Sequence, residues 1–119
     1  MVADNNKVGV GIDFGTSGCR AVAIDHSGKV LGDASLALPE PIHLGNGVEQ
    51  VPVLWAEALE QLLSELFTQV PPSTVGAIAI DGTSGTVLLA DEAGTPLTPA
   101  LMYNDNRAVN EAARIAQVA

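Results

Sequence analysis

Apolar residues alternate with small or polar ones over three stretches of the N-terminal part, namely residues 7–14, 19–25 and 30–38. Alternation with a period of two is typical of a β-strand that buries one face. The dipeptide Ser27-Gly28 between the second and third stretches predicts a tight turn. The pattern therefore predicts an antiparallel meander of three strands.

The period changes after residues 39–47, which hold two Pro and two Gly and are expected to be irregular. Over residues 52–70 apolar positions recur at steps of three and four, with Glu and Gln on the opposite side, which predicts an amphipathic helix. Pro52 suits its first turn, and the Pro71-Pro72 pair prevents its continuation.

The rest of the chain shows shorter apolar patterns. They predict a strand at the centre of the sheet over residues 75–80, a strand over 86–90, an extended segment over 97–103 and a helix over 107–118. The predicted order is β-β-β-α-β-β-α, which indicates an α/β domain with a mixed sheet.

Composition narrows the choice of partners. The chain is 47% hydrophobic but only 3% aromatic, so its core must be built from small aliphatic side chains. Five basic against fourteen acidic residues give a net charge of -9, which repels nucleic acid and anionic membranes. No apolar run reaches the roughly 18 residues of a spanning helix. Cys19 is the only cysteine, so no internal disulfide can form, and we expect a buried thiol in a cytoplasmic protein.

The segment Asp-Phe-Gly-Thr-Ser-Gly-Cys-Arg combines groups that suit a phosphate and a metal ion. Gly15, Thr16 and Ser17 offer bare amides and hydroxyl donors, and Arg20 adds a cation. Asp13 can hold a magnesium ion that bridges to the phosphate. The alternative is an ordinary hairpin turn, in which the same residue types are favoured. The segment lacks the GxxxxGK[ST] spacing and leads into a strand, which argues against a P-loop or a dinucleotide fold.

Three segments in order resemble the FGGY carbohydrate kinases of the actin, Hsp70 and sugar kinase superfamily, which have a ribonuclease H-like fold. They are residues 11–25, similar to the first phosphate motif, residues 78–91, similar to the sugar-side loop and its strand, and residues 99–108, similar to a Trp/Tyr-x-Asp-x-Arg segment. The resemblance implies that residues 1–119 form the N-terminal part of the first lobe. The second lobe and the general base would be absent from this chain.

The resemblance also implies roles on the nucleotide side. Asp13 would organise Mg²⁺ near the transferred phosphoryl group of ATP. Gly15, Thr16 and Ser17 would line the phosphate path, and Arg20 would face the nucleotide phosphates.

On the sugar side, the resemblance implies that Ser84, with Asp81 and Thr83 as weaker candidates, binds sugar hydroxyls. Asp105 and Arg107 would shape the far wall, although Asp105 or its neighbour Asn104 could equally be a helix cap. Xylulokinases tend to have Gln-Met-His in this loop, whereas Thr-Ser-Gly resembles ribulokinases and ribulose kinase-like proteins of plants and cyanobacteria. We therefore favour D-ribulose, with D-xylulose as the alternative.

The expected activity is ATP-dependent phosphorylation of a ketopentose by the parent enzyme. One part of a lobe supplies only one wall of a cleft, so the 119-residue chain alone is expected to be inactive. The competing hypothesis is a non-catalytic module that binds sugar or nucleotide, or an interaction domain. Surface left uncovered by the missing lobe would favour a homo-oligomer.

Overall fold

The computed structural model describes residues 6–119. These residues form two compact units, the first from residues up to 39 and 53–83, the second from residues 40–52 and 84–119. No helix in the described part of the chain has both the length and the apolar character needed to cross a membrane.

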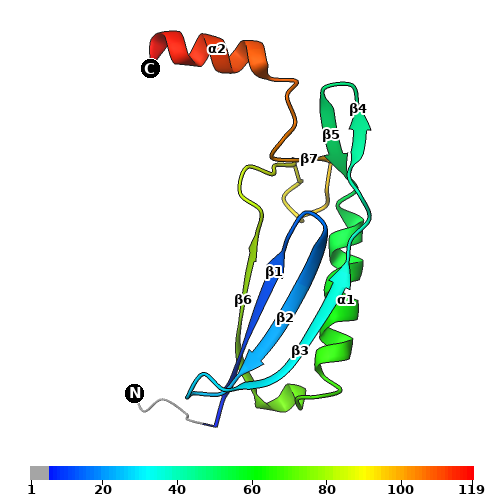
Figure 1. Cartoon of the computed structure of the whole chain (residues 1–119), viewed down its shortest axis with the longest axis vertical. Coiled ribbons are helices and arrows are strands. Elements are labelled where there is room, and N and C mark those ends of the chain that lie inside the picture. Colours follow the sequence, from blue (N-terminus) through cyan, green and yellow to red (C-terminus); the bar gives the residue numbers. More distant parts are fainter. Residues whose placement is uncertain (1–5) are drawn as a thin grey trace. The chain divides into compact units, whose positions relative to one another are not determined.

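The first unit is built on a four-stranded sheet with the order β3-β2-β1-β6 (Figure 1). Its strands are β1 (Val8–Phe14), β2 (Gly18–Ile24), β3 (Val30–Ala37) and β6 (Val75–Gly82). β1, β2 and β3 pair antiparallel, which confirms the predicted meander, and β6 joins β1 in parallel. The mixed sheet is therefore confirmed. The prediction that the fourth strand is central was wrong, because among the described residues β6 pairs with β1 alone and lies at the end of the sheet.

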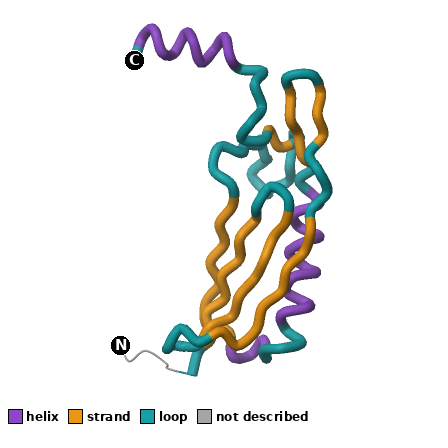
Figure 2. Tube along the Cα trace, in the orientation of Figure 1, coloured by secondary structure: helices purple, strands orange, loops and turns teal. Residues whose placement is uncertain are grey.

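One face of this sheet is covered by α1 (Val53–Leu66), which packs on β2 and β3 (Figure 2). Leu62 and Leu66 of the helix are the largest fully buried side chains, at 1% and 0% exposure. Cys19 is buried with them, as expected, and Trp55 packs against the same core. The helix ends before the predicted residue 70, because the chain turns at residues 67–69.

At the outer edge of β3, the side chain of Gln69 bonds the backbone groups that a further strand would otherwise bond. The Gln69 side-chain amide donates to the Asp33 carbonyl oxygen at 2.7 Å, and its oxygen accepts from the Asp33 N–H at 3.1 Å. The amide thus supplies one donor and one acceptor to the open edge, as a neighbouring strand would. Gly32 suits this close approach, since a Cβ there would lie 3.0 Å from Gln69 Cβ and would push the two apart.

The second unit contains a small sheet with the order β4-β5-β7. The strands of this sheet are β4 (Ile42–Leu44), β5 (Gly47–Gln50) and β7 (Ala100–Leu101), and the unit also contains the helix α2 (Val109–Val118). The prediction of irregular structure up to residue 47 was wrong, because β4 and β5 form a hairpin. Gly45, with a φ of 60°, is the first residue of its two-residue turn, a position that favours glycine.

Two further predictions for the second unit need correction. Residues 86–90 do not form a strand, since only Val87 and Ala90 pair, in isolated bridges to Leu101 and Pro96. α2 begins at Val109, two residues later than predicted, and no side chain caps its first turn. The cap alternative for Asn104 or Asp105 is therefore not what the structure shows.

Candidate functional site

The first group of predicted site residues meets where β1 and β6 end. Asp13 of β1 pairs with Asp81 of β6 in the parallel register and with Arg20 of β2 in the antiparallel register. Residues that pair across neighbouring strands lie on one face of a sheet, and this is the face that α1 leaves open. All three side chains are exposed. They line a concavity of about 370 Å³ whose floor includes Gly11 and Ala79.

The two carboxyl groups in this concavity influence each other. A hydrogen bond with the Asp13 carboxyl is the largest cause that raises the pKa of Asp81, followed by desolvation and by the negative charge of Asp13. Two neighbouring carboxylates repel each other, and a shared proton or a cation relieves that repulsion. The pair therefore favours a positively charged ligand on this face of the sheet.

The donor set fits a magnesium ion that is shared with a phosphate. Within residues 6–119 there is no cluster of three or more Asp, Glu, His or Cys that could form an all-protein metal cage. Magnesium characteristically uses one or two carboxylates and completes its shell with water and phosphate oxygens. Asp13, with Asp81 beside it, satisfies that requirement.

The turn between β1 and β2 provides the predicted phosphate donors. The Gly15 N–H donates to the Gly18 carbonyl oxygen at 2.9 Å, which folds Thr16 and Ser17 outward as the tip of the hairpin. Asp13, Gly15, Ser17 and Arg20 line a polar recess at this turn. None of the carboxylates that the structure describes forms an ion pair with Arg20, so its guanidinium remains available to an anion.

The two glycines of this turn lie where one stretch of backbone closely approaches another. Neither Gly15 nor Gly18 has a positive φ. A Cβ on Gly15 would lie 3.0 Å from the Gly18 carbonyl oxygen, and a Cβ on Gly18 would lie 3.0 Å from the Leu36 carbonyl oxygen. Glycine suits both positions because a Cβ would press on a backbone oxygen and force a small shift, and neither position is left-handed.

The sugar-side loop is divided between the two units. Thr83 belongs to the first unit, where its N–H donates to the Phe14 carbonyl oxygen at 3.1 Å. Ser84 and Gly85 belong to the second unit, and Gly85 has a φ of 80°. A Cβ on Gly85 would lie 3.5 Å from the Cβ of Tyr103, so the Ser84-Gly85 turn lies against that residue.

Tyr103 is a candidate that the sequence reasoning did not single out. Its side chain is 58% exposed beside the Ser84-Gly85 turn. The signal was present in the composition, because Tyr103 is the only tyrosine of a chain with few aromatic residues. An exposed ring next to a hydroxyl group can contact the apolar face of a sugar while the hydroxyl bonds its polar edge.

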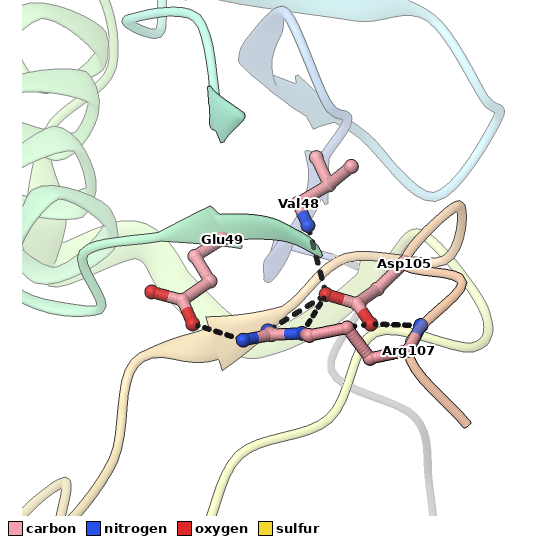
Figure 3. A network of polar contacts seen from close by, with 4 residues as sticks. All are labelled: Val48, Glu49, Asp105 and Arg107. Atoms are coloured by element: carbon pink, nitrogen blue, oxygen red, sulfur yellow. Dashed lines mark hydrogen bonds and ion pairs between the residues drawn. The ribbon is translucent and has the colours of Figure 1, made fainter. Parts of the chain in front are cut away.

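Asp105 and Arg107 form a polar network with β5 (Figure 3). The Arg107 guanidinium contacts the Asp105 carboxylate at 2.7 Å and the Glu49 carboxylate at 2.9 Å. Asp105 also accepts the Val48 N–H at 2.8 Å. The hydrogen bond from Arg107, followed by that from Val48, lowers the pKa of Asp105 to about 2. Sequence reasoning missed Glu49, because nothing in the linear order connects it to residue 107.

The structure thus gathers the predicted residues into two groups. Asp13, Gly15, Thr16, Ser17 and Arg20 share the first unit with Asp81 and Thr83, whereas Ser84, Asp105 and Arg107 share the second. Asp13, Gly15, Ser17 and Arg20 line one recess at the turn between β1 and β2, and Asp81 pairs with Asp13 in the parallel register.

Comparison with known proteins agrees with this geometry. Residues 8–118 match the family model for the N-terminal domain of the FGGY family of carbohydrate kinases. The chain belongs to this family. It is 30% identical over 116 residues to a xylulose kinase of Streptomyces coelicolor, which covers 97% of the chain and 23% of the relative. It is 32% identical over 105 residues to an apulose kinase of Pectobacterium atrosepticum, which covers 82% of the chain and 20% of the relative.

Solved structures of FGGY relatives have the same fold. A xylulose kinase from Rhodospirillum rubrum superposes with a TM-score of 0.83 at 25% identity, covering 95% of this chain and 24% of that chain. The structural neighbours are sugar kinases with the actin, Hsp70 and ribonuclease H-like fold, which confirms the predicted fold class. This FGGY domain spans about a fifth of the length of the curated relatives it matches.

Proposed function

We propose that the protein carrying this domain transfers the γ-phosphoryl group of ATP to a hydroxyl of a ketopentose. The observation that supports this most strongly is the juxtaposition of Asp13, Asp81 and Arg20 on an open sheet face, at the base of a hydroxyl-bearing turn, in a chain of the FGGY family. We favour D-ribulose as the sugar because of the Thr83-Ser84 dipeptide, with D-xylulose as the alternative.

On the nucleotide side, the Thr16 and Ser17 hydroxyls and nearby amides bind phosphoryl oxygens, and Arg20 contributes a positive charge. Asp13 holds Mg²⁺, which when bound neutralises negative charge on the phosphoryl oxygens. Asp81 lies on the boundary between the two substrates, because its strand leads directly into the sugar-side loop.

On the sugar side, Ser84 donates and accepts hydrogen bonds with sugar hydroxyls, with Asp81 and Thr83 as further candidates. Tyr103 lies beside the Ser84-Gly85 turn and offers an exposed ring, and Asp105 and Arg107 shape the far wall. Recognition of this kind uses a few placed polar groups on an otherwise apolar surface.

Calorimetry on the 119-residue chain tests the nucleotide half of the proposal. Wild-type protein is expected to bind ATP more tightly with Mg²⁺ than without it. Asp13→Asn removes that difference, because an amide is a poorer ligand for a hard cation. Asp33→Asn, the same change on the same open sheet face but on β3, is the matched control and should leave it intact. An Asp13→Asn variant with a full magnesium effect would refute the assignment.

A coupled assay of ADP release tests whether the chain works alone. No turnover of D-ribulose or D-xylulose is expected, because the family resemblance places the general base and the second wall of the cleft outside this domain. Sugar-dependent ADP release would contradict this. The competing function is a non-catalytic interaction domain. It would be supported by self-association in size-exclusion chromatography together with no binding of either sugar or ATP.

A further inference from the structure

The positive charge of Arg107 is neutralised by carboxylates of its own unit. Its Nη1 contacts Glu49 Oε1 at 2.9 Å, its Nη2 contacts Asp105 Oδ2 at 2.7 Å, and its Nε donates to the same Asp105 oxygen at 3.0 Å. Two carboxylates around one guanidinium leave a net charge of about -1. A group in that environment is poorly suited to attract a phosphate, and it is well suited to hold two segments together.

The guanidinium also fits closely over the start of β5. A Cβ on Gly47 would lie 2.9 Å from both Cζ and Nε of Arg107. Real Cβ atoms essentially never lie so close to a neighbour, so an alanine at position 47 would force the Arg107 side chain to shift. The carboxylates on either side hold Arg107 in this place.

Backbone contacts extend the connection on both sides of the ion pairs. The Met102 N–H donates to the Val48 carbonyl oxygen, and the Asn106 N–H donates to the Asn46 carbonyl oxygen, both at 2.9 Å. Asp105 accepts the Val48 N–H in return. Residues 102–107 are therefore bound to β5 and to the turn that precedes it.

The residue beside the sugar-side turn lies inside the segment that is held in this way. Tyr103 lies between Met102 and Asp105 in the sequence, and its Cβ faces Gly85. On the other side of β7, Leu101 pairs with Val87, just after the sugar-side loop. Anything that loosens residues 102–107 from β5 will therefore displace Tyr103 relative to Ser84.

We propose that Glu49 is a positioning residue for sugar binding: it fixes Arg107, and Arg107 with Asp105 holds Tyr103 in register with Ser84. This inference rests on the proposed function, since it assumes that Tyr103 and Ser84 face the sugar. It assigns Glu49 an indirect role, with no contact to sugar or nucleotide.

Nuclear magnetic resonance on the 119-residue chain tests it with D-ribulose and with Mg²⁺-ATP as probes. Glu49→Gln is expected to weaken D-ribulose binding about tenfold, a usual size for coupling within one ion-pair network. Hydrogen exchange at the Met102 and Asn106 amides should become faster. Binding of Mg²⁺-ATP should not change, because its residues lie in the first unit. A loss of both ligands would indicate general unfolding and would overturn the positioning role.

Two further variants separate geometry from charge. Arg107→Lys keeps the charge but loses the planar fork, so it should behave like Glu49→Gln. Glu92→Gln makes the same charge change in an exposed turn of the same unit and should match wild type. Wild-type sugar affinity in Glu49→Gln, in a chain that binds D-ribulose, would overturn the inference alone. If the wild type binds no pentulose, the sugar assignment and the inference both fail. Unchanged amide exchange in Glu49→Gln would instead refute directly the claim that Glu49 holds residues 102–107 on β5.

Discussion

The Gln69 side chain offers the sharpest test of how the first unit is held together. Replacing it by glutamate keeps the size and shape of the side chain and the oxygen that accepts the Asp33 N–H. It removes the donor of the 2.7 Å bond and places an anionic oxygen against the Asp33 carbonyl. The edge of β3 would then face repulsion at one of its two bonds to Gln69.

The structure sets the size of the expected effect. An intramolecular hydrogen bond contributes about 1 kcal/mol net to stability, and one of the two bonds is lost. With a urea slope of about 2 kcal/mol per molar, the unfolding midpoint should fall by about 0.5 M. Gln69→Leu, which removes both bonds, should lower the midpoint by up to about twice as much.

The assay is urea unfolding followed by tryptophan fluorescence. Trp55 is the only tryptophan, and it lies on α1 against the core of the first unit, so it reports on that unit. The loss should also depend on pH. The introduced carboxyl has a raised pKa in the folded state, because its neutral form can donate to the carbonyl oxygen. The difference from wild type should therefore be full at pH 7, should shrink as the pH falls through that raised pKa, and should stop changing below the unfolded value of about 4.3.

A double variant separates the two possible causes of the loss. Gln69→Glu with Asp33→Asn removes charge repulsion between the two side chains but leaves the missing hydrogen bond. The double variant should remain less stable than Asp33→Asn alone. Recovery to that level would assign the effect to charge, and an unchanged midpoint in Gln69→Glu would refute the role of Gln69 at the edge.

Three further predictions concern the core and the second unit. Leu66→Ala, at a side chain with 0% exposure, should cost about 2–5 kcal/mol in the same urea titration, and a loss below about 1 kcal/mol would contradict its burial. The chemical shift of the Val48 amide should follow the titration of the Asp105 carboxyl, which accepts its N–H, and so should report the pKa of Asp105. Because that pKa falls to about 2, its stabilisation of the second unit is present above about pH 4 and lost as the pH falls toward 2, and Asp105→Asn should abolish this part of the acid dependence. Gly47→Ala should displace the Arg107 guanidinium and cost about 1–3 kcal/mol, measured by thermal unfolding of the second unit, whereas an unchanged melting temperature would show that the site can relax.

Local chemistry accounts for the parts of the fold that the sequence predicted well. The turns after Asp25 and Asp91 are built alike. In each, the Asp Oδ1 accepts two backbone N–H groups, and a glycine with a φ near 85° follows three residues later. Such turns use contacts within five residues, and a strand pair joined by a short turn is nearly as local. The meander and α1 could be predicted for the same reason.

Other elements were mispredicted because their state depends on distant neighbours. Residues 86–90 have the composition of a strand, yet only isolated bridges form there, and Leu89 remains 64% exposed. Residues 42–50 contain two glycines and follow two prolines, yet they form a hairpin, and β7 supplies a further partner for β5. A strand needs an adjacent strand to satisfy its backbone groups, and propensity alone does not provide one.

By itself, the sequence determined the chemistry of the candidate site: which loops carry the carboxylates, hydroxyls and cation, and the family to which they are similar. Only the tertiary structure decided which of these groups meet. The parallel pairing of β6 with β1 brings Asp81 to Asp13, and the packing of residues 102–107 on β5 brings Arg107 to Glu49. Both contacts join segments that are far apart in the chain, and a single sequence records no such distance. Their geometry follows from strand register and close packing, which exist only once the chain has folded.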